Sequence, residues 1–491
     1  MQMSLADIFQ RNGLENTIMN DKHVTLCVDL DGTLIRSDVL LETLLLLVKQ
    51  KPWMVLLIPF WLLRGRSKLK HEIAKRVTLD VQTLPYQTDL LDFLKIEYAA
   101  GRSIVLATAS HRKFADGIAQ HLGIFTKVLA TDEGANVAGR AKRDLLVKHY
   151  GQRSFDYAGN SRADLHVWSM AREAIVVNPD NGVLRGAAAQ CPVSHTFEDG
   201  HPTLSTYGKA LRVHQWLKNI LVFVPMLLAH QISQFGLGLL AFTSFSLCAS
   251  SVYLLNDLLD MPADRLHPRK RLRPFASGDL SIVQGMVLIP LLLLCAFTIA
   301  ALWLPTAFAI VLAGYYLLTV SYSFWLKAVV LLDALLLAGL YTIRIIGGMA
   351  ATQIGPSFWL LTFSIFLFFS LALVKRYSEL LVLKQRGQLT THGRGYHVED
   401  LVMLMGFGVA SGFMAVLVSA LYINSDKIKV LYHHPALLWL VSPILLYWIS
   451  RIWLITHRGG MHDDPVVFAA KDKGSWAVAV IIGGLLWLAA I

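Results

Sequence analysis

The stretch Asn256–Asp264, with the sequence NDLLDMPAD, ends an apolar segment long enough to enter a membrane. On a helix, Asp257, Asp260 and Asp264 fall at i, i+3 and i+7, which is one face, and Asn256 lies one turn before Asp260. Grouped carboxylates repel one another unless a hard divalent cation lies among them, and Mg2+ prefers carboxylates together with phosphate oxygens. The stretch therefore predicts magnesium-assisted handling of a diphosphate beside lipid, in preference to a solvated helix end with scattered acids.

The composition excludes an ordinary soluble protein and a disordered one. Of the 491 residues, 55% are hydrophobic and only 16% are charged, with a mean hydropathy of +0.50. The net charge of +11 is typical of a membrane protein whose loop Lys and Arg residues face the cytoplasm. No basic helix interleaved with aromatic residues is evident in the polar part, so nucleic-acid binding is disfavoured. The four cysteines lack the spacing of a zinc site or a disulfide framework.

The apolar residues concentrate in the second half of the chain. Residues 219–491 contain about nine apolar segments, which predict an all-α polytopic membrane bundle. Basic residues gather in alternate loops, so these loops and the N-terminal part are expected in the cytoplasm, with the C-terminus on the opposite side of the cytoplasmic (inner) membrane. The expected organisation is a lead over 1–20, an α/β domain over 21–200, a linker or interfacial helix over 201–218, and the bundle over 219–491.

The first half alternates short apolar strands with helical patterns. Strands are expected at Val24–Asp29, Ser103–Ala107, Phe155–Ala158 and Ala174–Val177, with helices at Lys113–His121 and Lys142–Tyr150. This alternation predicts an α/β Rossmann-like, doubly wound sheet that binds ligands at the carboxyl ends of its strands.

Residues 38–100 interrupt that alternation and are expected to form a helical cap. Within them, Trp53–Leu63 is apolar but too short to span a bilayer, and basic residues follow it. Two interpretations stay open: a buried cap helix, or a helix that lies in the membrane interface.

Asp29 and Asp31 follow the first strand in the sequence DLDGT. The first carboxylate can attack phosphorus, and the second, on the same side of an extended segment, can protonate the leaving oxygen. This arrangement resembles the haloacid dehalogenase-like (HAD) phosphatases. The resemblance implies that Thr108 hydrogen-bonds the phosphoryl group and that Lys142 neutralises the charge of that group. It also implies that one Mg2+ is bound by four residues: Asp29, Asp31, Asn160 and Asp164. The family usually has Asp where this chain has Asn160, which leaves open an inactive or phosphate-sensing domain.

The aspartate-rich stretch and the basic residues after it resemble the UbiA superfamily of intramembrane prenyltransferases. The resemblance implies a second Mg2+, held with a diphosphate at Asp257, Asp260 and Asp264, of which the first two are catalytic. A second aspartate-rich DxxxD motif, expected in aromatic prenyltransferases, is missing. Other motifs resemble the decaprenyl-phosphate phosphoribosyltransferase branch, and the candidate substrate-binding residues are Arg212, Gln215, Lys218, Asn219, Asn256, Lys270, Arg273, Tyr322, Lys327, Arg344, Lys375, Arg376, Tyr377, Glu379 and Arg458. Asp463, Asp464 and Asp472 are further candidates for metal or ribose contacts.

The branch resemblance implies that phosphoribosyl pyrophosphate donates 5-phosphoribose to a polyprenyl phosphate in the bilayer. The N-terminal domain would then remove the 5-phosphate. Crowded phosphates require many cations, which the basic motifs supply. The alternatives are transfer of a prenyl group to an aromatic or other acceptor, an N-terminal domain that acts on another ester or is non-catalytic, and a transporter, for which no inverted repeat is evident. A homo-oligomer is also compatible with the sequence.

Overall fold

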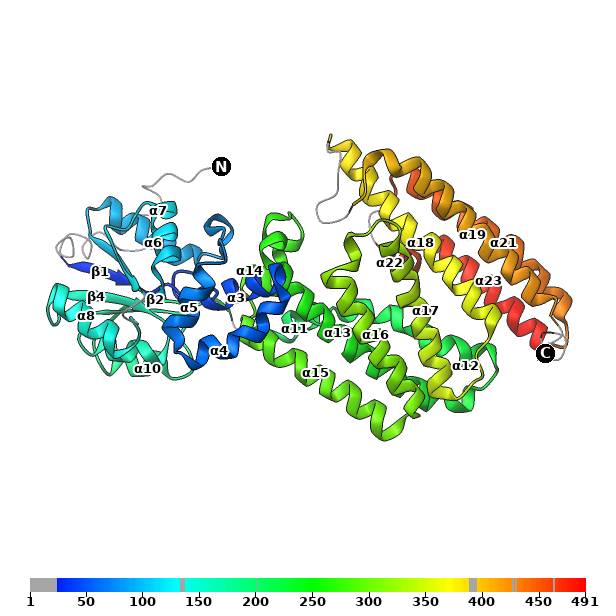
Figure 1. Ribbon diagram of the computed structural model, residues 1–491, viewed down its shortest axis with the longest axis horizontal. Helices are drawn as coiled ribbons and strands as arrows, with labels where there is room; N and C mark the ends of the chain where they lie inside the picture. Colours follow the sequence, from blue (N-terminus) through cyan, green and yellow to red (C-terminus); the bar gives the residue numbers. More distant parts are fainter. Residues whose placement is uncertain are drawn as a thin grey trace. The chain divides into compact units, whose positions relative to one another are not determined.

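The computed structural model describes residues 24–132, 137–200, 202–387, 395–425, 428, 431–461 and 464–491. The chain forms two compact units. The first comprises the chain up to Ala210 together with Leu254–Val287, and the second comprises Leu211–Tyr253 and Leu288–Ile491. The aspartate-rich stretch thus belongs to the same unit as the α/β domain. The chain can be followed in Figure 1 by its colour, from blue at the N-terminus to red at the C-terminus.

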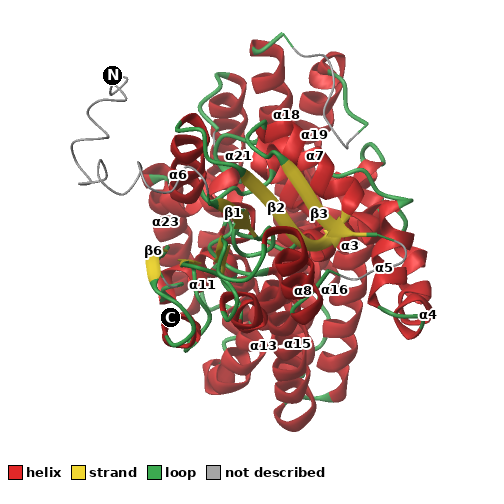
Figure 2. Ribbon diagram, turned by 90° about the vertical axis from the view of Figure 1, so that its left-hand side faces the viewer, coloured by secondary structure: helices red, strands yellow, loops and turns green. Residues whose placement is uncertain are grey.

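A parallel sheet lies at the centre of the first unit. Its strands follow the order β3-β2-β1-β4-β5-β6 and all neighbours are parallel, so the carboxyl ends of all six strands lie at the same end of the sheet. Strands β3, β2 and β1 are seen side by side in Figure 2. Cys27 of β1 pairs with Val105 of β2 on one side and with Tyr157 of β4 on the other. The bounds are β1 Thr25–Val28, β2 Ile104–His111, β3 Lys127–Thr131, β4 Phe155–Gly159, β5 Ala174–Val177 and β6 Val193–Phe197.

Helices cover both faces of this sheet, as the doubly wound prediction requires. Alternate strand residues point to opposite faces, so Leu26 and Val28 enter one core and Cys27 enters the other. The first core contains α6 (Thr88–Ala99) and α7 (Arg112–Leu122). The second contains α8 (Arg140–Tyr150), α9 (Leu165–Trp168) and α10 (Val183–Ala188).

Two strands were not expected from the sequence. β3 and β6 lie at the two edges of the sheet. β6 alternates half-buried and exposed residues, and β3 begins with an exposed lysine, so neither presents the continuous apolar run of a central strand.

The cap is a group of short helices with its own small core. It comprises α3 (Val39–Gln50), the 3-10 helix η1 (Pro52–Leu57), α4 (Ile58–Leu63), α5 (Arg66–Ala74) and η2 (Val81–Thr83). Leu47, Met54, Trp61 and Ile73 are buried in this core. The other face of Pro52–Leu63 stays exposed. The prediction of a buried cap helix therefore holds for only one face of this segment.

Eight helices of the described chain are long and apolar enough to cross a membrane, and the protein is an integral membrane protein. They include α13 (Phe235–Leu266), α15 (Ile282–Trp303), α16 (Thr306–Phe324), α17 (Leu332–Thr352), α18 (Phe358–Gln385), α19 (Leu401–Ile423), α21 (Val441–His457) and α23 (Lys473–Ala490). Three 3-10 helices extend these spans at their N-terminal ends: η5 (Ile232–Gln234) before α13, η8 (Val398–Asp400) before α19 and η9 (Pro435–Leu440) before α21. The remaining short elements are α11 (Leu204–Ala210), η3 (Arg162–Asp164), η6 (Lys270–Leu272), α14 (Pro274–Ser277), η7 (Leu326–Ala328) and α22 (Pro465–Lys471).

The first of the expected spans differs from the prediction. Where the predicted bundle begins, the chain forms a 3-10 helix, η4 (Val213–Phe223), and then α12 (Val224–Leu228), in place of one long apolar α-helix. This segment packs closely on α17, because a Cβ on Gly348 would lie 2.0 Å from the Val222 carbonyl oxygen. A 3-10 helix rises about 2.0 Å per residue, so these two elements together reach about 30 Å despite their few residues.

Candidate active sites

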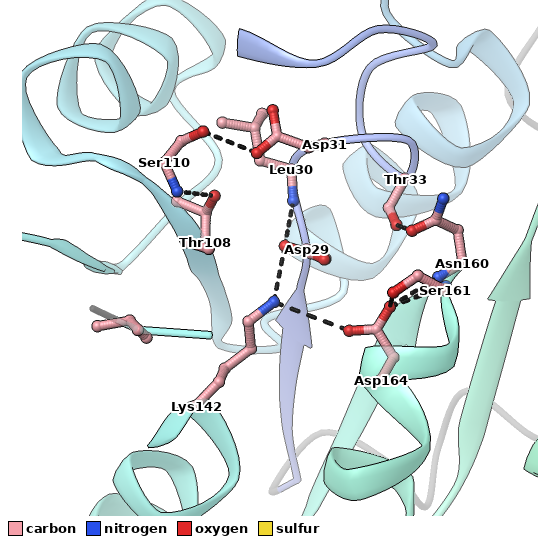
Figure 3. A network of polar contacts seen from close by, with 12 residues as sticks. Asp29, Leu30, Asp31, Thr33, Thr108, Ser110, Lys142, Asn160, Ser161 and Asp164 are labelled. Atoms are coloured by element: carbon pink, nitrogen blue, oxygen red, sulfur yellow. Dashed lines mark hydrogen bonds and ion pairs between the residues drawn. The ribbon is translucent and has the colours of Figure 1, made fainter. Parts of the chain in front are cut away.

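The first site lies at the carboxyl end of β1, where Asp29 and Asp31 leave the sheet (Figure 3). The Asp29 side chain is buried, and its Oδ1 atom accepts a hydrogen bond of 2.8 Å from the Leu30 N–H. The same oxygen pairs with Lys142 Nζ at 2.8 Å. Burial raises the pKa of Asp29 to about 6, although the charge of Lys142 acts in the opposite direction. Lys142 thus holds one oxygen of the candidate nucleophile and keeps the carboxylate ionised at neutral pH.

Lys142 also connects Asp29 with the chain after β4. Its Nζ atom donates to the Tyr157 hydroxyl at 2.9 Å and lies 3.8 Å from Asp164 Oδ1. Tyr157 in turn donates to Asp164 Oδ1 at 2.8 Å. Tyr157 is an interior residue of β4, and the sequence offered no motif that marked it. This buried chain fixes Lys142 at the strand ends.

Asp31 links the sheet to the cap. Its Oδ1 atom accepts the Val39 N–H at 2.8 Å at the start of α3, and its Oδ2 atom accepts the Ser110 hydroxyl at 2.7 Å. Burial and the neighbouring Asp38 raise the pKa of Asp31 to about 7, so this carboxyl can carry a proton near neutral pH. A group of that pKa suits the general acid expected at this position.

Thr108 lies in β2 beside these groups. Its hydroxyl oxygen accepts the Ser110 N–H at 2.9 Å, which leaves the hydroxyl proton for another acceptor. Ser110, two residues beyond the matched motif position, is a polar group that the sequence reasoning missed. Its contact with Asp31 assigns it to the site.

Asp164 and Asn160 differ in the number of hydrogen bonds that their side-chain oxygens accept. Asp164 Oδ2 accepts the N–H groups of Asn160 (3.2 Å) and Ser161 (2.9 Å), and the Ser161 hydroxyl at 2.8 Å. With Tyr157 on its other oxygen, Asp164 is fully hydrogen-bonded within the protein. Asn160 Oδ1 accepts only the Thr33 hydroxyl, at 3.3 Å, among the contacts described.

One cavity of about 730 Å3 is lined by most of these residues, namely Asp29, Asp31, Ser110, Lys142, Asn160 and Asp164, whereas Thr108 and Tyr157 do not belong to its lining. Asp29, Asp31 and Asn160 offer oxygen atoms to it, and oxygen ligands are what Mg2+ requires. Among the described residues, no three His, Cys, Asp or Glu side chains are grouped to hold a metal. A magnesium ion held by one or two protein oxygens, waters and a substrate phosphate nevertheless fits such a donor set.

The aspartate-rich stretch does not form a single cluster of bare carboxylates. Asp257 and Asp264 share Arg273, whose Nη1 atom lies 3.1 Å and 2.5 Å from them, while Asp260 pairs with Lys49 of α3 at 2.7 Å. The repulsion between the carboxylates, from which a metal ion was predicted, is therefore relieved by protein cations. Asn256 is half-buried nearby in sequence, and Lys270 is exposed.

A buried ion pair joins this stretch to the cap within the first unit. Arg265 donates to both carboxylate oxygens of Glu42, at 2.6 Å and 3.1 Å, and both side chains are buried. Ser37 donates to the same carboxylate at 2.5 Å. Bidentate pairs of this kind are geometrically specific. Glu42 belonged to no motif and Arg265 was only one of the basic residues after the aspartate-rich stretch, so their pairing is known only from the fold.

In the second unit, Lys218 and Lys375 meet at Asp464. Their Nζ atoms lie 3.0 Å and 3.3 Å from Asp464 Oδ2, and Tyr341 donates to Oδ1 at 3.3 Å. Lys218 also lies 5.5 Å from the centroid of the Tyr341 ring. Two cations thus share one carboxylate. This cluster carries a positive surplus that a substrate phosphate can satisfy.

Arg344 is buried one turn from Tyr341 on α17. It donates to Asn219 Oδ1 at 2.7 Å, to the Tyr315 hydroxyl at 3.0 Å and to the Leu340 carbonyl oxygen. Asn219 in turn donates to Ser246 at 2.9 Å. Arg344 and Asn219, distant in sequence, are brought into direct contact, and the guanidinium is held rigidly by these partners.

A separate network occupies Arg376. This buried side chain pairs with Asp333 at 2.5 Å and Glu379 at 2.7 Å, and donates to the Tyr322 hydroxyl at 3.1 Å. Tyr396 donates to the other oxygen of Asp333. The guanidinium is saturated by protein groups. Arg376, Tyr322 and Glu379 are therefore brought together, but as a packed interior network.

The remaining candidates are dispersed. Arg212 has a left-handed backbone (φ 51°) and lies 5.2 Å from the Tyr253 ring centroid, and Tyr377 bonds His457 at 2.9 Å. Gln215 and Lys327 are half-buried, and Arg458 is exposed. Asp472 pairs with Arg451 at 2.6 Å and caps α23, whereas Asp463 lies outside the described residues.

The second unit therefore has the character of an intramembrane enzyme: apolar helices surround charged side chains whose positions are fixed by buried hydrogen bonds. The UbiA prenyltransferase family matches residues 219–471, which is more than half of the chain. The protein belongs to this family.

The chain is also similar to three curated proteins. The chain is 37% identical, over 96% of its length and 92% of the relative's, to an uncharacterized protein of Sinorhizobium fredii. It is 38% identical to the nodulation protein NoeC of Azorhizobium caulinodans, over 58% of this chain and 93% of that protein. It is 35% identical to the decaprenyl-phosphate phosphoribosyltransferase of Mycolicibacterium smegmatis, over 40% of this chain and 65% of that enzyme.

Two solved structures are similar to separate parts of the chain. A UbiA homolog from Archaeoglobus fulgidus bound to GPP and Mg2+ covers 58% of this chain and all of its own, with 16% identity and a TM-score of 0.44. A HAD family hydrolase from Salmonella enterica covers 35% of this chain and 66% of its own, with 12% identity and a TM-score of 0.26.

Proposed function

We propose that the membrane bundle transfers 5-phosphoribose from phosphoribosyl pyrophosphate to a polyprenyl phosphate, and that the N-terminal domain removes the 5-phosphate from the product. The similarity to decaprenyl-phosphate phosphoribosyltransferase supports the first step. The observation that carries it is the meeting of Lys218 and Lys375 at one carboxylate, because two cations held by a single acid can take up a further anion.

In the transfer step, an oxygen of the lipid phosphate attacks the anomeric carbon of the donor. The bond from that carbon to the pyrophosphate oxygen breaks, and pyrophosphate leaves. Lys218 and Lys375 neutralise substrate phosphate oxygens, while Arg344 keeps Asn219 and Tyr315 in position. A magnesium ion bound with the diphosphate would stabilise the leaving group; its predicted ligands Asp257 and Asp260 pair with Arg273 and Lys49 and would have to exchange these partners to hold it.

In the hydrolytic step, the carboxylate of Asp29 attacks phosphorus and forms an aspartyl-phosphate, and Asp31 gives its proton to the leaving sugar oxygen. Water then attacks the phosphorus, with Asp31 taking the proton, and releases inorganic phosphate. Lys142 balances the phosphoryl charge from its place beside Asp29. A magnesium ion at Asp29 and Asn160 would neutralise the remaining charge; this is the second of the two sites we propose.

The experiment uses the full chain in lipid nanodiscs with polyprenyl phosphate and ribose-labelled phosphoribosyl pyrophosphate. We expect the wild type to yield lipid-extractable label without a 5-phosphate, and the Asp29→Asn variant to yield lipid-linked label that keeps it. Absence of lipid-linked label from both proteins refutes the transferase. Retention of the 5-phosphate by both refutes the phosphatase role. Transfer from a prenyl diphosphate to an added aromatic acceptor would favour the alternative reaction.

A further inference from the structure

The outer face of Pro52–Leu63 is unusually apolar for the surface of an α/β domain. Leu56, Phe60 and Leu63 are 74%, 65% and 85% exposed, and Trp53 is 61% exposed. These side chains lie opposite the buried Met54 and Trp61, so the segment has two apolar faces and only one of them is covered. A contiguous exposed apolar face marks an interaction surface.

Basic residues border this face. Lys51 precedes it, and Arg64, Arg66 and Lys68 follow it, all exposed. Between Val39 and Val77 the acidic residues are Glu42 and Glu72, and each is ion-paired within the protein. An apolar face with a cationic border matches the two attractions of an anionic bilayer surface.

The same segment forms part of the phosphatase cavity. Leu62, which is 51% exposed, lines the cavity together with Asp29 and Asp31. Ser281, Ile282 and Val283, at the start of α15, line the same cavity. α15 is apolar enough to cross a membrane, and its first turn belongs to the first unit. The lining of the cavity therefore includes residues of an exposed apolar segment and of the beginning of a membrane span.

We propose that Pro52–Leu63 lies in the interface of an anionic bilayer, and that the cavity beside it takes phosphate esters carried on lipids in preference to soluble ones. The exposed side chains enter the acyl boundary, the basic border contacts lipid phosphates, and a lipid headgroup reaches Asp29 without leaving the membrane surface. The substrate class rests on the proposed phosphatase activity. The membrane contact does not depend on it.

The contact is tested by spin labels on the full chain, in a Cys295→Ser background, in nanodiscs that contain anionic lipid. Labels are placed at Phe60→Cys and Leu63→Cys, with Lys148→Cys on the exposed surface of α8 as the matched control. We expect the first two labels to relax with lipid-soluble oxygen and to be protected from an aqueous nickel chelate, and the control to behave oppositely. A Phe60 label as open to nickel as the control overturns the proposal, and so does protection from both reagents, which indicates coverage by protein.

The substrate class is tested with the double variant Leu56→Asp/Phe60→Asp. We expect hydrolysis of polyprenyl-phosphoryl ribose 5-phosphate in the nanodisc to fall roughly tenfold, because charged groups oppose insertion, while hydrolysis of free ribose 5-phosphate stays within about twofold. An equal fall for both esters, or none for the lipid-borne one, overturns the substrate assignment. If the wild type hydrolyses neither ester, the phosphatase proposal fails while the spin-label result still decides the membrane contact.

Discussion

The two units hold their charged groups in different ways. In the first unit, Asp29, Asp31 and Lys142 come from strand ends and a helix start around one sheet edge, where they line an open cavity. In the second, charges lie within long helices and mostly neutralise one another, as Arg376 does with Asp333. Residues at the carboxyl ends of parallel strands are accessible to a ligand because the strands end there. A helical bundle does so only where the packing leaves a charge incompletely matched, as at Lys218, Lys375 and Asp464.

The largest effect is expected where the open cavity performs chemistry. Asp29→Asn should lower the hydrolysis of ribose 5-phosphate at least about a thousandfold, because the amide cannot act as the nucleophile. Steady-state phosphate release measures it. Asp144→Asn, on the exposed surface of α8, is the matched control and should hydrolyse normally. Equal rates for both variants would remove Asp29 from the reaction.

Arg376 distinguishes a structural network from a binding site. Arg376→Met should lower the free energy of unfolding by about 3–5 kcal/mol, because Asp333 is left buried without its cation. The comparison is Arg451→Met, which removes a bidentate pair whose side chains are 26% and 14% exposed and should cost less, about 1–2 kcal/mol. Both are measured by denaturant unfolding in detergent micelles. A stable Arg376→Met protein that fails only to bind donor would assign the residue to the substrate.

A substitution at Lys218 tests whether this lysine of the bundle binds substrate or is structural. Lys218→Met should lower kcat/KM for phosphoribosyl transfer roughly a hundredfold with little loss of stability, because a cation for a substrate phosphate disappears. Lys384→Met, an exposed lysine of α18, is the control and should transfer at the normal rate. If Lys218→Met unfolds readily and transfers normally once folded, its pair with Asp464 is structural.

The smallest effect is expected at Asn160. Asn160→Asp restores a charge to the proposed magnesium site and should lower the Mg2+ concentration for half-maximal phosphatase activity about tenfold. The titration is made with free ribose 5-phosphate, so that the membrane contact does not enter. Asn160→Ala is the control, and its half-maximal concentration should rise. An unchanged midpoint in both would show that position 160 is not a ligand.

The sequence predicted the first unit well because its motifs follow strand ends. Four strands of the parallel sheet, the cap and the association of Asp29 with Lys142 were expected, and the structure contains them. β3 and β6 were not predicted because edge strands lack a continuous apolar run. Ser110 and Tyr157 were missed because hydroxyl groups in strands are common and only their partners give them a role.

The membrane bundle was predicted by hydropathy, but the roles of its charged residues were less accessible. Apolar length and composition are local properties, so the long helices were readable, apart from the mixed 3-10 and α segment Val213–Leu228. Whether an arginine binds substrate or neutralises a buried acid depends on what packs beside it. Arg344 and Arg376 look alike in sequence, yet one holds Asn219 and the other is enclosed by Asp333 and Glu379.

The chain's order of apolar runs, strand-end acids and basic loops was enough to define two kinds of domain, because hydrophobic periodicity and strand-end motifs are encoded locally. Only folding decided that the aspartate-rich stretch joins the unit of the α/β domain, that Arg273 and Lys49 neutralise its acids, and that Leu62 and Val283 border one cavity. These outcomes depend on contacts between residues far apart in the chain, and local patterns do not specify which distant side chain fills a given space.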